Sequence, residues 1–553
     1  MTPSSTQPER AGILGWIERT GNRLPDPVFI FFYLIIGLMV ISVVAALAGA
    51  SAVHPTEVDE ETGAATVIAA QSLLSAENIR KLWVEMPTTF THFHPLGYVL
   101  VVMLGAGVAE RSGLFGTAMR AGVRNAPKNL LTPFVALTAM MGNLAADAAY
   151  VVLIPLAGVI YAAAGRHPIA GIAAAFAGVS GGFSANLLPG QLDALLFGIT
   201  QEAAEAIVPA WQPNIAGNWF FIAAMTFVFL PVIWYVTDRI IEPRLGRYVP
   251  QGQAAVSAGA APQAAAAPLP EGVAEPEAEE ARDAPLTGGQ RKGLRWAGLA
   301  TLGVIALWLL FTVGPGTPLI DQEAAPEGRL TPFYRSLVAG FFLLFLAAGW
   351  AYGKAAGTVN NHRDLVRMMS ESMGDLAYYL VLAFAAAHFV AMFNWSNLGL
   401  ISAVHGASGL KQLALPAPAL LALVVLFTAA LNLFVGSASA KWALLAPVLV
   451  PMLMLLGISA ETTTAAYRVG DSATNIITPL MVYFPLILIF CQRWQKDFGL
   501  GSLAAMMLPY SLWLLAAGTA LMMLWVGLDL PLGPDAPVYY QLPATTPAAA
   551  AAT

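Results

Sequence analysis

The chain has 553 residues, of which 57% are hydrophobic and only 11% carry a charge. Soluble proteins carry about 25% charged residues, so this composition excludes water as the main solvent and indicates a protein of the lipid bilayer. The formal net charge is -6 and the chain has no long run of Lys or Arg, which argues against nucleic acid as a partner. The single Cys491 excludes an internal disulfide, a thiolate zinc site and an iron–sulfur cluster.

Long apolar segments dominate the sequence. The first begins near Pro27 and is too long, and too far from the N-terminus, for a cleaved signal sequence, so it is expected to be the first membrane span. A membrane helix needs about 20 mostly apolar residues. Nine segments meet that requirement: about 28–50, 95–113, 168–199, 218–237, 294–314, 334–352, 372–396, 466–491 and 503–527.

Two further apolar stretches, 130–165 and 415–455, are interrupted by small and polar residues. The first is broken by GNLAADAA after an arm too short to cross a bilayer, which predicts a re-entrant hairpin. The second is broken by GSASAK, but its arms are long enough for two full spans. Its length alone therefore leaves both interpretations open.

An internal repeat favours a second hairpin. Asp147, Tyr150 and Pro155 recur as Ser439, Trp442 and Pro447 at the same spacing. Each copy is followed by another broken motif, GGFSANLLPG at 181–190 and VGDSATNIITP at 469–479. Such repeats, with discontinuous helices at matched positions, are typical of secondary transporters. The pattern predicts an all-α polytopic membrane protein with nine transmembrane helices, two opposed re-entrant hairpins and broken helices in an inverted repeat.

The distribution of basic residues predicts the orientation. With the N-terminus in the cytoplasm, most Lys and Arg fall on the cytoplasmic side, as the positive-inside rule requires. The first hairpin then enters from the cytoplasm, the second enters from outside, and the C-terminus is periplasmic. The basic residues left outside are Arg80, Lys81, Arg329, Arg335 and Lys411.

Residues 251–290 are rich in Ala, Pro and Glu and have almost no large apolar side chain. This composition predicts a disordered cytoplasmic linker between two halves. We divide the chain into seven parts: an N-terminal segment with the first scaffold helices (1–129), a first hairpin with a broken helix (130–199), a scaffold helix (200–250), the linker (251–290), scaffold helices (291–396), a second hairpin with a broken helix (397–491), and the last helix with the tail (492–553).

Charged side chains within apolar segments are costly in a bilayer and are therefore candidates for function. Arg468 and Asp471 can lie on one helical face, either as a structural ion pair or, as we prefer, with Arg468 holding a substrate carboxylate. Asp193 follows a Pro–Gly pair and is expected to accept a proton, contact substrate or cap a helix. The charges within the spans are Asp147, Asp193, Lys441, Arg468 and Asp471, with Glu110 and Asp375 nearer helix ends.

Oxygen-bearing side chains cluster at the four breaks. Unwound backbone adds carbonyl oxygens, so each repeat could assemble a sodium site, although any one of these side chains alone is better explained by helix packing. The sodium candidates are Asn143, Asp147, Ser184, Asn186, Asn432, Ser437, Ser472 and Asn475, with Ser439 and Thr474 beside them. Trp442, next to the second break, is suited either to stack on an aromatic ligand or to pack the hairpin tip.

Several motifs resemble the p-aminobenzoyl-glutamate transporter (AbgT) family over nearly the whole chain apart from the tails and the linker. The matching stretches are GWIERTGNRLPDP, VMLGAGVAERSGL, AADAAYVVLIP, GRHPIAG, GFSANLLPGQLDALL, IIEPRLG, FVAMFNWSN, GSASAKWALLAPVLVPM and YRVGDSATNIITP. One departure is GISAE at 457–461, where the family pattern tends to place a proline. We therefore expect a more flexible connection after the second hairpin.

The resemblance implies a homodimer in the bacterial inner membrane, in contact with membrane lipid, with a scaffold and a transport core in each subunit. It also implies a small-molecule substrate: an aromatic amide of glutamate for some members, and sulfonamide antimetabolites, which are exported, for others. Carried over by motif, the substrate-binding positions are Asp193, Ser439, Trp442, Arg468, Asp471 and Pro479, and Asn432 becomes a sodium ligand.

The resulting hypothesis is an ion-coupled secondary transporter that needs no cofactor beyond a coupling ion, either Na⁺ or a proton. The rival within transport is a sodium-coupled carboxylate or peptide uptake system on the same inverted-hairpin scaffold. An intramembrane hydrolase would need a nucleophile with a base in reach, but the one histidine within the spans, His388, lies in an apolar segment without a motif. The sequence therefore predicts a transporter rather than an enzyme. A passive channel would differ by showing flux that does not saturate.

Overall fold

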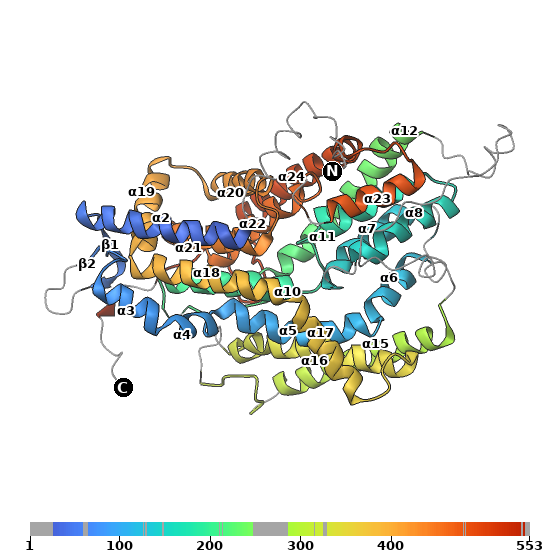
Figure 1. The fold of residues 1–553 in the computed structure, drawn as a ribbon, viewed down its shortest axis with the longest axis horizontal. Coiled ribbons are helices and arrows are strands. Elements are labelled where there is room, and N and C mark those ends of the chain that lie inside the picture. Colours follow the sequence, from blue (N-terminus) through green and yellow to red (C-terminus); the bar gives the residue numbers. More distant parts are fainter. Residues whose placement is uncertain are drawn as a thin grey trace, which may run out of the picture.

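A computed structural model provides the three-dimensional structure of the chain, which is almost entirely helical (Figure 1). The structure describes residues 26–58, 65–124, 127, 130–145, 149–209, 211–212, 214–246, 286–313, 316–323, 329–478, 481, 483–542 and 546–547. Most of the predicted linker, residues 251–285, therefore lies outside the described residues, as does most of the C-terminal tail after Pro543.

Six described helices are long and apolar enough to cross a membrane. A bent pair, α5 and α6, makes a seventh candidate with an angle of 64° between its two parts. The chain is thus a polytopic helical membrane protein, and these helices agree with the predicted segments. The long helices are α2 (Pro27–Leu47), α11 (Trp219–Tyr235) continued through η5 (Val236–Ile241) and α12 (Glu242–Leu245), α15 (Gly288–Thr312), α16 (Thr331–Ala356), α18 (Ala377–Trp395) and α24 (Leu500–Gly527), and the bent pair is α5 (His94–Arg111) with α6 (Leu114–Arg124).

Shorter apolar helices occupy the regions that the sequence marks as broken. In the first region, α7 (Leu131–Met141) tightens into the 3-10 turn η2 (Gly142–Ala145), and the chain returns through η3 (Ala149–Leu153) and α8 (Ile154–Ala163). The following span is split into α9 (Pro168–Phe176) with its π-helical end η4 (Ala177–Gly181), an irregular stretch, and α10 (Gln191–Glu205).

The second region has the same order of elements. Helices α20 (Ala417–Asn432) and α21 (Ala438–Met454) are separated by a five-residue turn, and the next span is split into α22 (Ala460–Thr474) and α23 (Phe484–Trp494). The break within this split span lies later than the sequence suggests, because α22 continues without interruption through Gly470 and Asp471 to Thr474.

The elements pack into groups that are distant in sequence. Helices α15 and α16 lie side by side along one edge of the molecule (Figure 1), where α16 packs on α5, and α5 also contacts the amphipathic helix α17 (His362–Asp375). Helix α2 packs on α18, while α20, α22, α24 and α11 form another group. The broken helices of the two repeats meet in the interior, where α10 of the first repeat contacts α21 and α22 of the second.

Helix α22 packs unusually close to the backbone of α20. A Cβ atom added to Gly470 would lie 2.3 Å from the carbonyl oxygen of Val425 on α20, so only glycine fits at this crossing. Every residue of α22 is buried, although the helix includes an arginine and two carboxylates. A buried helix of this composition requires internal partners for its polar side chains.

Several elements outside the spans have no counterpart in the predictions. A three-stranded sheet in the order β2–β1–β3 lies after α2. Its strands are β1 (Ser51–Val58), β2 (Ala65–Ala69) and β3 (Thr546–Pro547), and the short or connecting helices are α3 (Ala76–Val84), α4 (Met86–Thr91) and α19 (Leu398–Gln412).

The start of α15 differs from the predicted end of the linker. Helix α15 begins at Gly288, inside the predicted linker, because the Thr287 hydroxyl accepts from the Gln290 amide and the Gln290 side chain accepts from the Thr287 amide.

The connection between α21 and α22 is held by specific contacts. Gly457 adopts a left-handed φ of 81° and Ser459 caps α22, while its amide donates to Val538. These contacts define the geometry of the connection, and its greater flexibility stays a prediction.

Candidate functional site

The start of α10 presents a buried carboxylate. Asp193 lies in the first turn, where its Oδ2 accepts a 2.7 Å hydrogen bond from the amide of Gly190. Its Oδ1 lies 2.6 Å from the guanidinium of Arg468 on α22. Asp193 is 3% exposed and Arg468 is 1% exposed, so each charge is neutralised by the other away from solvent. Asp193 therefore serves as a helix cap and as an ion-pair partner.

A second ion pair lies one helical turn further along α22. The ammonium of Lys441 on α21 contacts both the carboxylate of Asp471 and the side-chain oxygen of Asn432. All three residues are buried. The Asn432 amide nitrogen lies 2.7 Å from the backbone oxygen of Asp471 and 2.9 Å from the side-chain oxygens of both Thr474 and Asn475.

These contacts change the expected pairing on α22. Arg468 and Asp471 were considered as partners of each other, but Arg468 bonds to Asp193 and Asp471 bonds to Lys441. The partners come from α10 and α21, so the two ion pairs connect the break of the first repeat and the tip of the second to one central helix. Lys441 was recognised in the sequence as an intramembrane charge but was not placed among the binding residues.

A direct hydrogen bond joins the break of the first repeat to helix α22 of the second. The backbone amide of Ser184 donates to the hydroxyl of Ser472 over 3.0 Å, although the residues are 288 positions apart. Ser472 in turn donates to the carbonyl of Arg468. The Ser184 hydroxyl and the Nε of Arg468 are buried and have no hydrogen-bond partner. Two buried polar groups of this region, one on each repeat, are thus without a hydrogen-bond partner.

The remaining break residues of the first repeat bind backbone. The side-chain nitrogen of Asn143 donates to Gly182 over 3.3 Å, and that of Asn186 donates to Met140 over 3.4 Å. These bonds tie the end of α7 to the irregular stretch before α10. Asp147, the remaining sodium candidate of this repeat, lies outside the described residues.

Trp442 is completely buried between two helices of the site. Its ring stacks on Tyr467 with centroids 4.5 Å apart, and its Nε1 donates to the Thr200 hydroxyl at 3.0 Å and to the Leu196 carbonyl at 3.2 Å. One ring face is therefore occupied by a protein aromatic. Stacking on a ligand, as expected from the sequence, requires the tip of the second hairpin to move.

The tip itself is only half-buried. Ser437 caps α21 by accepting from the amide of Ala440 at 3.3 Å, and its hydroxyl lies 3.2 Å from that of Ser439. Ser439 lines an apolar cleft of about 10 Å³. That volume holds roughly one water molecule and no aromatic amide. Pro479, the last expected binding residue, lies outside the described residues.

The oxygen donors predicted to hold sodium are thus partly engaged. In the second repeat, the Asn432 and Asp471 oxygens that would coordinate a cation already contact the Lys441 ammonium. A sodium ion would have to replace this ammonium. In the first repeat, Ser184 offers a buried hydroxyl without a partner, whereas Asn143 and Asn186 direct their nitrogens at carbonyls.

Comparison with known proteins gives a consistent result over the whole chain. The model of the AbgT putative transporter family matches residues 12–540. The p-aminobenzoyl-glutamate transport protein of Escherichia coli (strain K12) is 36% identical over 533 residues, which cover 96% of this chain and 97% of that protein.

Two solved structures have the same fold. The Alcanivorax borkumensis YdaH transporter is 43% identical with a TM-score of 0.80, covering 92% of this chain and 100% of that chain. Neisseria gonorrhoeae MtrF, described with a class of antimetabolite efflux pumps, is 42% identical with a TM-score of 0.85, covering 95% of this chain and 99% of that chain. These relatives are transporters, which confirms the prediction that the chain is not an enzyme.

Proposed function

Because the chain belongs to the AbgT putative transporter family, we propose that it is an ion-coupled secondary transporter of p-aminobenzoyl-glutamate-like folate fragments, of sulfonamide antimetabolites, or of both. The substrate classes follow from the E. coli relative and from the efflux pumps with which MtrF is described. The observation that carries the proposal is the pair of buried ion pairs, Asp193–Arg468 and Lys441–Asp471, at the meeting point of the two repeats.

The proposed topology has nine spans in the bacterial inner membrane. Counting each split helix once, the spans are α2, α5, α9 with α10, α11, α15, α16, α18, α22 with α23, and α24. The hairpin of α7 and α8 enters from the cytoplasm and that of α20 and α21 from the periplasm, with the N-terminus cytoplasmic and the C-terminus periplasmic. The positive-inside rule supports this orientation. The functional unit is a homodimer, in which 130–199 and 397–491 form the transport core of each subunit.

Arg468 is proposed to hold the substrate carboxylate. Its guanidinium presents a planar fork that matches a carboxylate, and its Nε lies buried without a partner. An arriving carboxylate would replace Asp193 at this fork. Because an unpaired buried charge costs several kcal/mol, Asp193 would then need another partner. The coupling ion, a proton or Na⁺, is proposed to be that partner.

The Lys441–Asp471 pair is proposed as the second coupling element. A sodium ion binding between Asn432 and Asp471 would need the oxygens that the Lys441 ammonium now contacts. Binding of the ion and contact with the lysine are therefore mutually exclusive, which is the behaviour required of a switch between two states.

Substrate entry requires opening at the second hairpin. The cleft at Ser439 measures about 10 Å³, far below the volume of an aromatic amide. Separation of Trp442 from Tyr467 would expose an indole face on which the substrate ring stacks.

A binding series tests the substrate class. Purified protein in detergent would be titrated with p-aminobenzoyl-glutamate, p-aminobenzoate, sulfonamides and simple dicarboxylates, and the affinities compared. The proposal predicts selective binding of the aromatic compounds. Equal affinity for simple dicarboxylates or peptides would instead identify a carboxylate or peptide uptake system on the same scaffold.

A further inference from the structure

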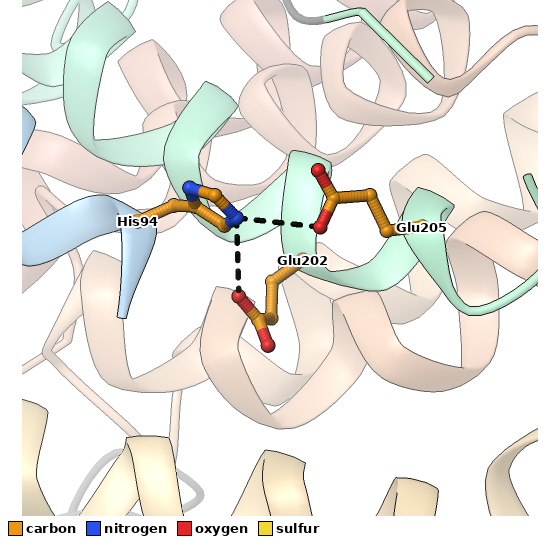
Figure 2. A group of neighbouring side chains, drawn as sticks. All are labelled: His94, Glu202 and Glu205. Atoms are coloured by element: carbon orange, nitrogen blue, oxygen red, sulfur yellow. Dashed lines mark ion pairs between the residues drawn. The ribbon is translucent and has the colours of Figure 1, made fainter. Parts of the chain in front are cut away.

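A histidine and two glutamates meet away from the buried ion pairs, where the start of α5 packs on the end of α10 (Figure 2). The Nε2 of His94 lies 3.3 Å from the carboxylate of Glu205 and 4.0 Å from that of Glu202. The three ligand atoms lie within 4.8 Å of one another. Glu202 and Glu205 are one turn apart on α10, so both face His94.

These atoms are of the types that bind zinc, and one of their separations already matches a zinc site. Zn²⁺ binds His nitrogen at about 2.0–2.1 Å and carboxylate oxygen at about 2.0–2.2 Å, so tetrahedral ligand atoms lie roughly 3.3–3.5 Å apart. The His94–Glu205 distance of 3.3 Å already has this value, and the His94–Glu202 distance of 4.0 Å requires a shift of less than 1 Å. One histidine with two carboxylates leaves a fourth position open.

The charges also favour a cation. A protonated His94 can neutralise only one of the two carboxylates, and the second then faces a like charge within a few ångströms. A divalent ion neutralises both carboxylates and binds the neutral imidazole. The side chains of His94, Glu202 and Glu205 are 35%, 26% and 29% exposed, so an ion can reach them.

Neighbouring residues orient one ligand. The Gln201 side-chain nitrogen donates to Glu205 Oε1 over 2.7 Å, and the hydroxyl of Tyr98 on α5 donates to Gln201 over 3.0 Å. Glu205 therefore keeps its Oε2 directed at His94. Hydrogen bonds of this kind to metal-binding carboxylates commonly fix their geometry.

A cavity beside the cluster provides room for the remaining ligand. It has a volume of about 300 Å³ and is lined by His94, Tyr98, Gln201, Tyr334 and Arg335, among others. A water molecule or a small anion in this cavity could complete the coordination, and Arg335 would stabilise an anion there.

From this geometry we propose that His94, Glu202 and Glu205 form a Zn²⁺ site that fastens the end of α10 to the start of α5. Helix α10 carries Asp193 at its other end. A bound ion would therefore hold in place the helix that presents the carboxylate partner of Arg468. The site uses none of the residues of the transport mechanism above.

The test is zinc binding by the full-length protein in detergent, after treatment with a chelator and gel filtration. Metal analysis and titration against a zinc indicator are expected to give one ion per chain. His94→Ala, Glu202→Gln and Glu205→Gln should each lower the affinity by at least the roughly 10–100-fold that is typical for loss of an orienting neighbour. The matched controls, His405→Ala and Glu77→Gln, remove an exposed histidine and an exposed glutamate and should bind as the unaltered protein does.

A spectroscopic measurement on the unaltered protein keeps the proposal testable if a variant misfolds. Co²⁺ should replace zinc and give the intense visible absorption of a four-coordinate site, and excess Mg²⁺ should not displace it, because a histidine ligand favours zinc over magnesium. Absence of stoichiometric zinc, displacement by Mg²⁺, or unchanged affinity in a folded His94→Ala variant would each overturn the proposal.

Discussion

Arg468 and Asp193, 275 residues apart in the chain, form a 2.6 Å ion pair that connects the central helix α22 to the start of α10. The bond joins the first copy of the internal repeat, which contains Asp193, to the second copy, which contains Arg468. It also makes the two residues interdependent, which determines how their variants should behave.

Removing one partner of this pair should destabilise the protein more than removing both. Arg468→Ala and Asp193→Ala each leave a buried charge without its partner, at an expected cost of about 3–5 kcal/mol. Combining Arg468→Met with Asp193→Leu should recover most of the thermal stability while abolishing transport. Thermal unfolding in detergent measures this, and additive losses in the double variant would contradict the pairing.

Arg468→Ala should also affect ligands according to their charge. Loss of the guanidinium removes the partner of a substrate carboxylate, so binding of p-aminobenzoyl-glutamate should weaken by at least about tenfold more than binding of a neutral sulfonamide. An equal loss for both ligand classes would make Arg468 structural.

Lys441→Met should alter the response to sodium. If the ammonium occupies the place of the coupling ion between Asn432 and Asp471, its removal should lower the sodium concentration for half-maximal transport by about tenfold. Uptake into proteoliposomes at graded sodium concentrations measures the shift. Retained transport with unchanged sodium dependence would place the coupling ion elsewhere.

Gly470→Ala should separate α20 from α22. The added Cβ would lie 2.3 Å from the Val425 carbonyl, and overpacking of this kind costs about 1–3 kcal/mol. Gly409→Ala, in a helix where a Cβ meets no atom within 4 Å, is the control and should leave stability unchanged. Equal melting temperatures for the two variants would argue against the close crossing.

Much of the helical architecture was predictable because apolar length and broken motifs are local properties of the sequence. The predicted spans have counterparts in the described helices, and the breaks near Asn143, Asn186 and Asn432 coincide with helix ends. The second break of the C-terminal repeat was placed too early. The sequence motif contains Gly470 and Asp471, but close packing on α20 and the Lys441 ion pair keep that turn helical.

The contacts within the site were less predictable. Which basic residue neutralises Asp193 or Asp471 depends on how distant helices pack, and sequence proximity misleadingly favoured Arg468 with Asp471. The strands β1, β2 and β3 are too short to give an apolar signal of membrane length. The Glu202–Glu205 spacing was visible, but nothing in the sequence places His94 beside it.

The central claim is coupled transport through this site, and counterflow tests it most directly. Proteoliposomes containing the full-length protein and loaded with unlabelled p-aminobenzoyl-glutamate would be diluted into labelled substrate, with and without sodium and pH gradients, beside vesicles containing the Arg468→Met/Asp193→Leu protein. The account predicts saturable accumulation that depends on a gradient and is lost in the double variant. Absence of counterflow at any substrate concentration, or flux that never saturates, would contradict it.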